Sequence, residues 1–357
     1  MKRILWITLI LSLFSSLSSA KERRAFYSSV RCQAMGGACI AVANDETALL
    51  INPAGLGRLR DYFGTLIDPE IELGSNTYSF YSESNFSSPF NLEDIKAALD
   101  QKRGDYYHAK AQVFPSFVAR NFGIGLYGNY LLDAEMSDDG STIDTYYRND
   151  LALVLGFNFR FFDGRMKLGF STKLISRIEV NDPAVSTSDS LSYSHIGSEG
   201  LGVSTDIGLM FSAPWTYLPT ITAVLRDLGD TKFDQGHGMR MSSNLRPETV
   251  EQDLDLGVAL FPIHTNGIRS SWTLEYRGIL TADKEEDKAK LLHAGVEFNF
   301  ADRLFVRAGY NQRYITGGLE LSSGNFQWQL ATYGEEIGTS ANPREDRRYT
   351  MKFAYRF

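Results

Sequence analysis

Hydrophobic and polar residues alternate with a period of two along much of this chain. Between residues 151 and 161 every odd position is Leu or Phe, and the positions between them carry Ala, Val, Gly, Asn and Arg. Successive side chains of a β-strand point to opposite faces, so this pattern predicts strands with one apolar face. Similar alternation runs through residues 166–174, 203–211, 254–260, 272–277, 294–300 and 304–311.

Residues 349–357, at the end of the sequence, show the same alternation. Large apolar side chains occupy the odd positions: Tyr349, Met351, Phe353, Tyr355 and Phe357. A final strand with one apolar and one polar face that ends on Phe is typical of the strand that closes a bacterial outer-membrane barrel. A half-buried strand of a soluble sheet has the same pattern, so this segment alone does not decide between the two.

The polar faces of these predicted strands carry charges of both signs and several glycines. A soluble sandwich does not need small residues on a solvated face, whereas the inner wall of a barrel must accommodate a plug or crowded side chains. Desolvated charges in a lumen need partners. We therefore expect a set of charged residues to face the lumen: Arg160, Lys167, Lys173, Asp206, Asp255, Glu275, Arg277, Glu297 and Arg307. A solvated face explains the charges equally well, but it explains the glycines less well.

The connections between the predicted strands alternate in length. Short ones cover residues 120–121, 162–164, 213–215, 263–266, 301–302 and 322–325, and long polar ones cover 137–145, 181–200, 230–250, 281–288 and 335–347. Short periplasmic turns and long outer loops are the outer-membrane pattern. Residues 62–84 read as one strand or as two joined at Gly74-Ser75. Closed bacterial barrels have an even number of strands, so we count one and expect about 14.

One helix is predicted to interrupt the strands. Asn91 can cap it, and Leu92, Ile95 and Leu99 share one face at helical spacing. The helix follows the first predicted strand, so we expect it at the outer rim with its apolar face packed on the barrel mouth.

The start of the chain resembles a secretory signal peptide. Lys2 and Arg3 precede an apolar stretch over residues 4–14, and Ser18-Ser19-Ala20 offers a cleavage site. The apolar stretch is too short for a membrane helix, which needs about 20 residues. We therefore predict three regions: a cleaved signal peptide at 1–20, an N-terminal plug at 21–60 and an outer-membrane barrel at 61–357.

Composition narrows the class of protein further. Mean hydropathy is -0.21, and 43% of residues are hydrophobic and 13% aromatic, which argues against both a helical membrane protein and a disordered chain. Removal of Lys2 and Arg3 with the signal takes the formal net charge from -7 to -9, and no basic stripe suggests nucleic acid as a partner. Cys32 and Cys39 either pair in an oxidising periplasm or remain buried thiols.

Residues 21–60 break the strand pattern and are rich in Ala and Gly. Asn44 or Asp45 can cap one short helix. Asn52 can cap a second, with Pro53 in its first position and Gly57 at its end. A compact segment of small residues ahead of a barrel is well suited to fill the lumen.

This segment resembles the N-terminal hatch of the FadL-type outer-membrane transporter superfamily, which includes PorV-like and TraF-like barrels. The residues that carry the resemblance are Gly36, Gly37, Ala38, Asp45, Asn52, Pro53, Ala54, Gly55 and Leu56. The resemblance implies a 14-stranded barrel with the hatch in its lumen. It also implies passive passage of small hydrophobic molecules, such as fatty acids or aromatics. For PorV-like members it implies instead a component of a protein-secretion system.

Four kinds of partner follow from this interpretation. They are outer-membrane lipid with lipopolysaccharide, the barrel-assembly machinery at the C-terminal strand, hydrophobic small molecules, and envelope secretion proteins.

Motifs for catalysis or cofactor binding are weak. Residues 123–128 match the dinucleotide fingerprint, but the motif lies within a predicted strand and no helix follows it. The five histidines are scattered without metal-ligand spacing, and no nucleophile elbow is present. A barrel enzyme using His195 or His237 in the outer loops is the weakest alternative. We expect no catalytic, cofactor-binding or metal-binding residues.

Overall fold

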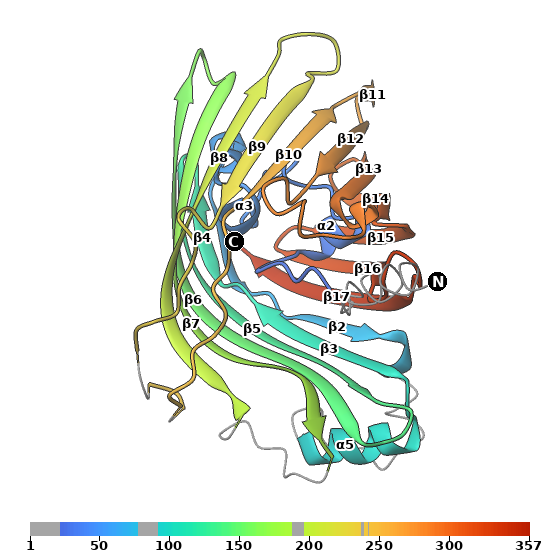
Figure 1. Ribbon diagram of the computed structural model, residues 1–357. Coiled ribbons are helices and arrows are strands. Elements are labelled where there is room, and N and C mark those ends of the chain that lie inside the picture. The colour runs from blue at the N-terminus through green and yellow to red at the C-terminus, as the bar shows by residue number, and fades with distance from the viewer. Residues whose placement is uncertain (1–21, 78–91, 188–195, 237–238, 242) are drawn as a thin grey trace, which may run out of the picture.

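A closed antiparallel β-barrel of 14 strands surrounds a small helical segment. The computed structural model describes residues 22–77, 92–187, 196–236, 239–241 and 243–357, and the predicted signal peptide at 1–20 lies outside them (Figure 1). The fold class predicted from the alternation is therefore confirmed. Within the described ranges, no helix is both long and apolar enough to cross a membrane.

Three of the strands in the described ranges consist of two segments each. The pairs are β1 (Phe63–Ile67) with β2 (Glu70–Gly74), β3 (Tyr106–Val113) with β4 (Ser116–Ala119), and β10 (Asp253–Leu260) with β11 (Ile263–Thr265). Each break contains a proline, which cannot donate a hydrogen bond to the ladder. The first strand is thus broken at Pro69. The stretch counts as one strand, as predicted, and Gly74 of the alternative junction is the last residue of β2. Residues 78–84 lie outside the described ranges.

The remaining strands follow in chain order, and each pairs antiparallel with the strand that precedes it. They are β5 (Phe122–Met136), β6 (Thr142–Phe161), β7 (Met166–Ser186), β8 (Ser198–Ser212), β9 (Thr220–Arg226), β12 (Ile268–Tyr276), β13 (Leu292–Phe300), β14 (Leu304–Asn311), β15 (Tyr314–Ser323), β16 (Phe326–Glu336) and β17 (Glu345–Arg356). Strands β6 and β7 extend into segments predicted as loops, because their ladder continues as far as Thr142 opposite Ser186.

Strand β17 closes the barrel. It pairs with β1 at Thr65 opposite Arg356 and with β2 at Ile71 opposite Met351. Met351 is 48% exposed, whereas Lys352 beside it is 3% exposed. The strand predicted to close the barrel therefore does so, with its apolar side chains outward.

The distribution of exposed residues separates a membrane barrel from a soluble sheet. Leu151 and Phe157 in β6 are each 51% exposed, while Ala152 and Val154 on the other face are buried. Large apolar side chains, including Trp272, continue this exposed band around the outside. Charged and polar residues fill the interior. A soluble sandwich has the opposite arrangement, so lipid is the natural solvent for the outer face.

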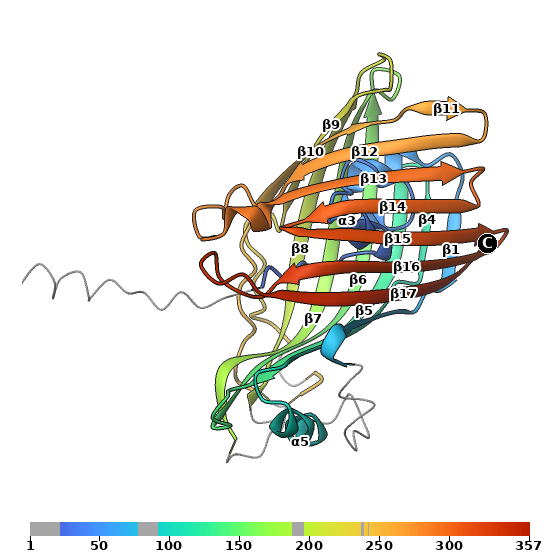
Figure 2. The same ribbon diagram turned by 90° about the vertical axis from the view of Figure 1, so that its right-hand side faces the viewer.

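Helix α5 (Leu92–Gln101) lies beside the extended ends of β5 and β6, far from the C-terminus (Figure 1, Figure 2). Its Ile95 and Leu99 are buried against an apolar cluster that includes Leu132 and Ile143. The helix therefore packs on the barrel mouth as its apolar face indicates. The predicted cap, Asn91, lies outside the described residues.

Candidate lumen site

Residues 22–60 of the plug form two short α-helices and one 3-10 helix. They lie inside the barrel (Figure 1). They are α2 (Val30–Ala34), α3 (Ala48–Ile51) and η2 (Pro53–Arg58). Helix α2 gave no sequence signal, since five residues are too few to show a period. Helix α3 begins after Thr47, and Asp45 instead accepts a hydrogen bond from the Thr47 backbone N–H at 3.0 Å. Asn52 caps η2 as predicted, and that helix ends at Arg58, one residue beyond Gly57.

Asn52 joins two parts of the plug to the barrel wall. Its Nδ2 donates to the Ile40 carbonyl at 2.7 Å and to Thr222 Oγ1 of β9 at 2.9 Å. Its Oδ1 accepts from the Ala54 backbone N–H at 3.0 Å. The side chain is fully buried, so this amide uses both ends to hold the start of η2 on the wall.

The Gly36-Gly37 pair forms a turn that favours glycine. Both residues have positive φ, at 66° and 84°. The His293 ring Nδ1 lies 2.9 Å from the Gly36 carbonyl oxygen, and the Arg277 guanidinium donates to the Gly37 carbonyl. A Cβ on Gly36 would lie 2.5 Å from Tyr310 N. The turn therefore rests directly on strands β13 and β14, and the buried Ala38 follows it.

Glycines on the inner face of the wall receive the plug backbone. A Cβ on Gly169 would lie 2.1 Å from the Pro53 carbonyl carbon, and one on Gly208 would lie 2.1 Å from Asn52 Oδ1. Within the plug, Gly55 packs against the Ala43 carbonyl in the same way, and Leu56 is fully buried. The inward glycines thus mark where plug and wall touch.

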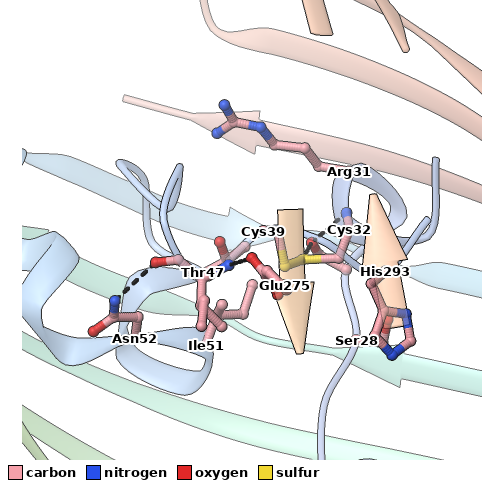
Figure 3. The surroundings of a disulfide bond; sticks show 12 residues. Ser28, Arg31, Cys32, Cys39, Thr47, Ile51, Asn52, Glu275 and His293 are labelled. Carbon is pink, nitrogen blue, oxygen red and sulfur yellow. Dashed lines mark hydrogen bonds between the residues drawn. A yellow bond between two sulfur atoms is a disulfide. The ribbon is translucent and has the colours of Figure 1, made fainter. Parts of the chain in front are cut away.

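Cys32 and Cys39 form a disulfide, with their Cα atoms 5.3 Å apart. The bond closes a loop around the Gly36-Gly37 turn and lies beside Glu275 and His293 of the wall (Figure 3). Of the two states that the sequence left open, the structure contains the paired one.

Replacing both cysteines by serine is expected to loosen this loop without unfolding the barrel. Closing so short a loop removes unfolded-state entropy worth about 2 kcal/mol. Hydrogen exchange should therefore become faster over residues 30–43 in C32S/C39S, while β6 and β7 keep their protection. Unchanged exchange in the loop would show that contacts with the wall, and not the disulfide, hold the turn.

Most of the predicted lumen-facing charges are buried and paired. Lys173 Nζ lies 2.8 Å from Asp206 Oδ2, and the Arg277 and Glu275 side chains approach to 3.2 Å. Two further carboxylates pair with arginines: Asp255 with Arg226 at 2.6 Å, and Glu297 with Arg307 at 2.6 Å.

Arg160 and Lys167 differ from the other predicted charges. Neither has a carboxylate within ion-pair distance among the described residues. Lys167 Nζ donates to the Gly164 carbonyl at 2.6 Å. Arg160 is exposed near the β6–β7 turn, at the end of its strand.

Sequence reasoning missed the charges that attach the plug. Arg31 pairs with Glu297 at 2.8 Å, and Arg24 pairs with Asp133 at 2.8 Å. Asp133 also lies 2.6 Å from His108 Nδ1, whose Nε2 faces Glu72 at 2.9 Å. The partners of each pair are far apart in the chain. The sequence pattern therefore showed that the strands have a polar face, but not which charges pair.

Asp45 makes one attachment of the plug sensitive to acid. Burial alone raises the pKa of its carboxyl, but Arg31 and Arg356 hold that pKa below the ordinary value of 3.8. A group whose pKa is depressed on folding stabilises the fold above its unfolded pKa and loses that contribution as pH falls through the folded one. Protease access to the plug should therefore rise below about pH 4. In the D45N variant, protease access to the plug should depend less on pH. Identical profiles of protease access against pH in D45N and wild type would contradict the role of Asp45.

An aromatic cluster lies where the plug meets the broken strands. The Tyr27 ring is 6.0 Å from Phe114 and 5.6 Å from Tyr127, and Phe26 is 5.0 Å from Tyr127. Phe114 lies at the break between β3 and β4 and is fully buried. The cluster provides an apolar region in a lumen that is otherwise rich in charge.

The hydrogen-bond ladder is interrupted beside this cluster. The pairing joins Thr65 to Ser116 on one side and Glu70 to Gln112 on the other. Between these pairs, residues 66–69 and 113–115 face each other without ladder pairs. Asp68 Oδ1 accepts from the Phe114 backbone N–H at 2.6 Å in place of a ladder bond. Here the wall is held by a side chain, and Leu66 and Ile67 point outward on the lipid side.

Comparison with solved structures identifies the fold. The Pseudomonas putida toluene transporter TodX aligns with 95% of this chain and 99% of its own, at TM-score 0.57 and 12% identity. The chain has the fold of the FadL-type outer-membrane transporters. The monoaromatic hydrocarbon channel CymD aligns with 91% of this chain and 96% of its own, at TM-score 0.56 and 9% identity. The Ralstonia pickettii toluene transporter TbuX aligns with 92% of this chain and 98% of its own, at TM-score 0.52 and 12% identity.

No protein-family model and no curated protein matches the sequence. At these identities the similarity to solved structures establishes the fold alone. The predicted resemblance to the FadL-type superfamily is confirmed at the level of the fold.

Proposed function

We propose that this protein is a passive outer-membrane channel for small hydrophobic molecules, such as aromatic hydrocarbons or fatty-acid-like compounds. The aromatic cluster beside the interrupted ladder carries the proposal. It joins an apolar region of the lumen to the lipid-facing surface at the one strand pair, among the described residues, where both neighbouring strands are broken. The two solved toluene transporters and the hydrocarbon channel share the fold.

The proposed route runs from the outer mouth to the lipid. Apolar molecules gather at the apolar cluster that includes Leu132 and Ile143, under helix α5. They then pass the N-terminal segment of the plug and reach Phe114 in the aromatic cluster. From there they leave sideways through the interrupted part of the ladder, at residues 66–69 and 113–115, into hydrocarbon, where transfer from water is favourable. No bond is made or broken on this route, so the proposed function requires no catalytic residue and no cofactor.

The cellular setting is part of the same proposal. Residues 1–20 direct export and are removed, residues 21–60 act as the plug, and residues 61–357 form the barrel in the outer membrane. Lipopolysaccharide surrounds its outer rim, and the barrel-assembly machinery recognises β17. The Asn52-Pro53-Ala54 segment helps to hold the plug closed.

Uptake by whole cells tests the channel. Cells with a lipopolysaccharide outer membrane that express the protein should take up radiolabelled toluene several-fold faster than cells with an empty vector. Phe114→Lys, which places a charge at the proposed exit, should return the rate to that of the vector. Phe305→Lys is the matched control, because Phe305 lies on the same inner face as Arg307 but on β14, away from the exit.

Folding of each variant is checked by its heat-modifiable mobility on a gel. Equal toluene uptake with and without the wild-type protein would reject the channel. Equal uptake by the two lysine variants would reject the exit beside Phe114.

A further inference from the structure

Five buried residues around the ladder interruption carry polar atoms without a hydrogen-bond partner in the described part of the chain. The atoms are Tyr27 Oη, Thr65 Oγ1, Glu70 Oε1, Ser116 Oγ and both amide atoms of Asn129. No residue of this group is more than 9% exposed. Leaving a buried donor or acceptor unmet is costly, and such groups are rare in folded proteins. Other such atoms are scattered through the described residues, but this group lies beside aromatic rings, which makes the region a candidate binding site.

The pairing of the strands brings these groups together. Thr65 lies opposite Ser116, and Glu70 lies opposite Gln112, which in turn lies opposite Asn129. Gln112 also accepts a hydrogen bond from the Tyr127 hydroxyl at 3.0 Å. The unmet atoms thus border the aromatic cluster defined above.

Tyr27 and Glu70 supply a donor and an acceptor. Burial, followed by the charges of Glu70 and Asp68, raises the pKa of Tyr27 well above its ordinary value, so its hydroxyl stays protonated. Glu70 Oε1 offers a free lone pair beside it. Lys110 and Lys352 act on Glu70, Lys352 pairs with Asp68 at 3.2 Å, and Lys173 Nζ lies 5.1 Å from the centre of the Phe26 ring. The site therefore presents both hydrogen-bonding roles at the edge of apolar rings.

We propose that the lumen binds hydroxylated monoaromatic molecules, the phenols, in preference to the corresponding hydrocarbons. The ring of the ligand packs among Phe26, Phe114 and Tyr127. Its hydroxyl accepts from Tyr27 and donates to Glu70. A hydrocarbon leaves both groups unmet. This assignment rests on the proposed channel function and names its substrate class.

Entry of the ligand requires movement of the plug's N-terminal segment. The unmet atoms are buried, and Phe26 and Tyr27 pack against Tyr127 beside them. The seated state bears the cost of those unmet groups, and the ligand hydroxyl relieves it. A site that hydrogen-bonds a hydroxyl discriminates strongly against the analogue that lacks one.

The matched pair p-cresol and toluene tests the inference, because the two differ by one hydroxyl. Initial uptake rates of both radiolabelled compounds are measured in expressing cells and corrected for empty-vector cells. The wild type should favour p-cresol at least tenfold. Tyr27→Phe and Glu70→Gln should each abolish most of that preference, measured as the ratio of the p-cresol rate to the toluene rate. Tyr146→Phe is the control, because its hydroxyl already has a partner in Glu179 at 2.9 Å.

The outcomes separate this inference from the proposed function. If toluene uptake exceeds that of the vector but p-cresol has no advantage, the phenol site is rejected and the channel stands. A p-cresol preference that survives both Tyr27→Phe and Glu70→Gln also rejects the site. If neither compound enters faster than in vector cells, the channel itself is rejected.

Discussion

Gly169→Leu is expected to unseat the plug and convert a closed barrel into an open pore. A Cβ at this position would lie 2.1 Å from the Pro53 carbonyl carbon and 2.3 Å from Ala54 N, both backbone atoms of η2. A backbone held on both sides cannot retreat as a flexible side chain does, so the added side chain excludes the plug. The barrel ladder between β7 and β8 does not depend on that contact and should still form.

Single-channel conductance in planar bilayers measures the effect. Wild-type protein should show little ion conductance, and the conductance of Gly169→Leu should be at least tenfold higher. Gly317→Leu is the matched control, because the nearest atom to its added Cβ is the Arg307 carbonyl oxygen, at an ordinary 3.7 Å. A folded Gly169→Leu protein that conducts no more than the control would show that the plug is not seated on this glycine.

Glu297→Ala is expected to release the other side of the plug. Glu297 accepts from Arg31 of the plug at 2.8 Å and from Arg307 of the wall at 2.6 Å, and it is 4% exposed. Removing this carboxylate takes a shared partner from the part-buried Arg31, which keeps Asp45, and from the buried Arg307, which keeps Glu320. Loss of hydrogen bonds to charged groups of this kind typically costs about 1.5–3 kcal/mol. The free energy of unfolding in detergent micelles, measured with urea, should fall by that amount.

An exposed ion pair provides the comparison for Glu297. Glu251 pairs with Lys284 at 2.6 Å in the outer loops, where both side chains are more than half exposed. Glu251→Ala should cost at most about 1 kcal/mol. Similar losses in the two variants would mean that Glu297 does not anchor Arg31.

The barrel was predictable because its signal is local. Between Leu151 and Phe161, the apolar residues at odd positions show from the sequence alone which side chains face outward. The same holds for β17. The inward glycines also carried information, since Gly169 and Gly208 mark contacts with the plug. Both signals depend only on the two-residue period of a strand.

The partners of the lumen charges were not predictable, because strand register decides them. Lys173 lies opposite Ser204, and its carboxylate partner Asp206 lies diagonally across the pair. Arg24 and Asp133 meet only because the N-terminal segment crosses the lumen. The ladder interruption was missed for another reason: Pro69 and Pro115 are far apart in the sequence, and only the pairing shows that they fall side by side.

Nitroxide accessibility on β6 tests the central claim, which is that hydrocarbon covers the outward side chains of this barrel. Spin labels at Leu153 and Phe157 are compared with one at Lys284 in an outer loop, in protein reconstituted into lipid bilayers. The account predicts that oxygen relaxes the two β6 labels strongly while a water-soluble nickel chelate barely reaches them, with the reverse at Lys284. Free access of the chelate to Leu153 and Phe157 would contradict the membrane barrel.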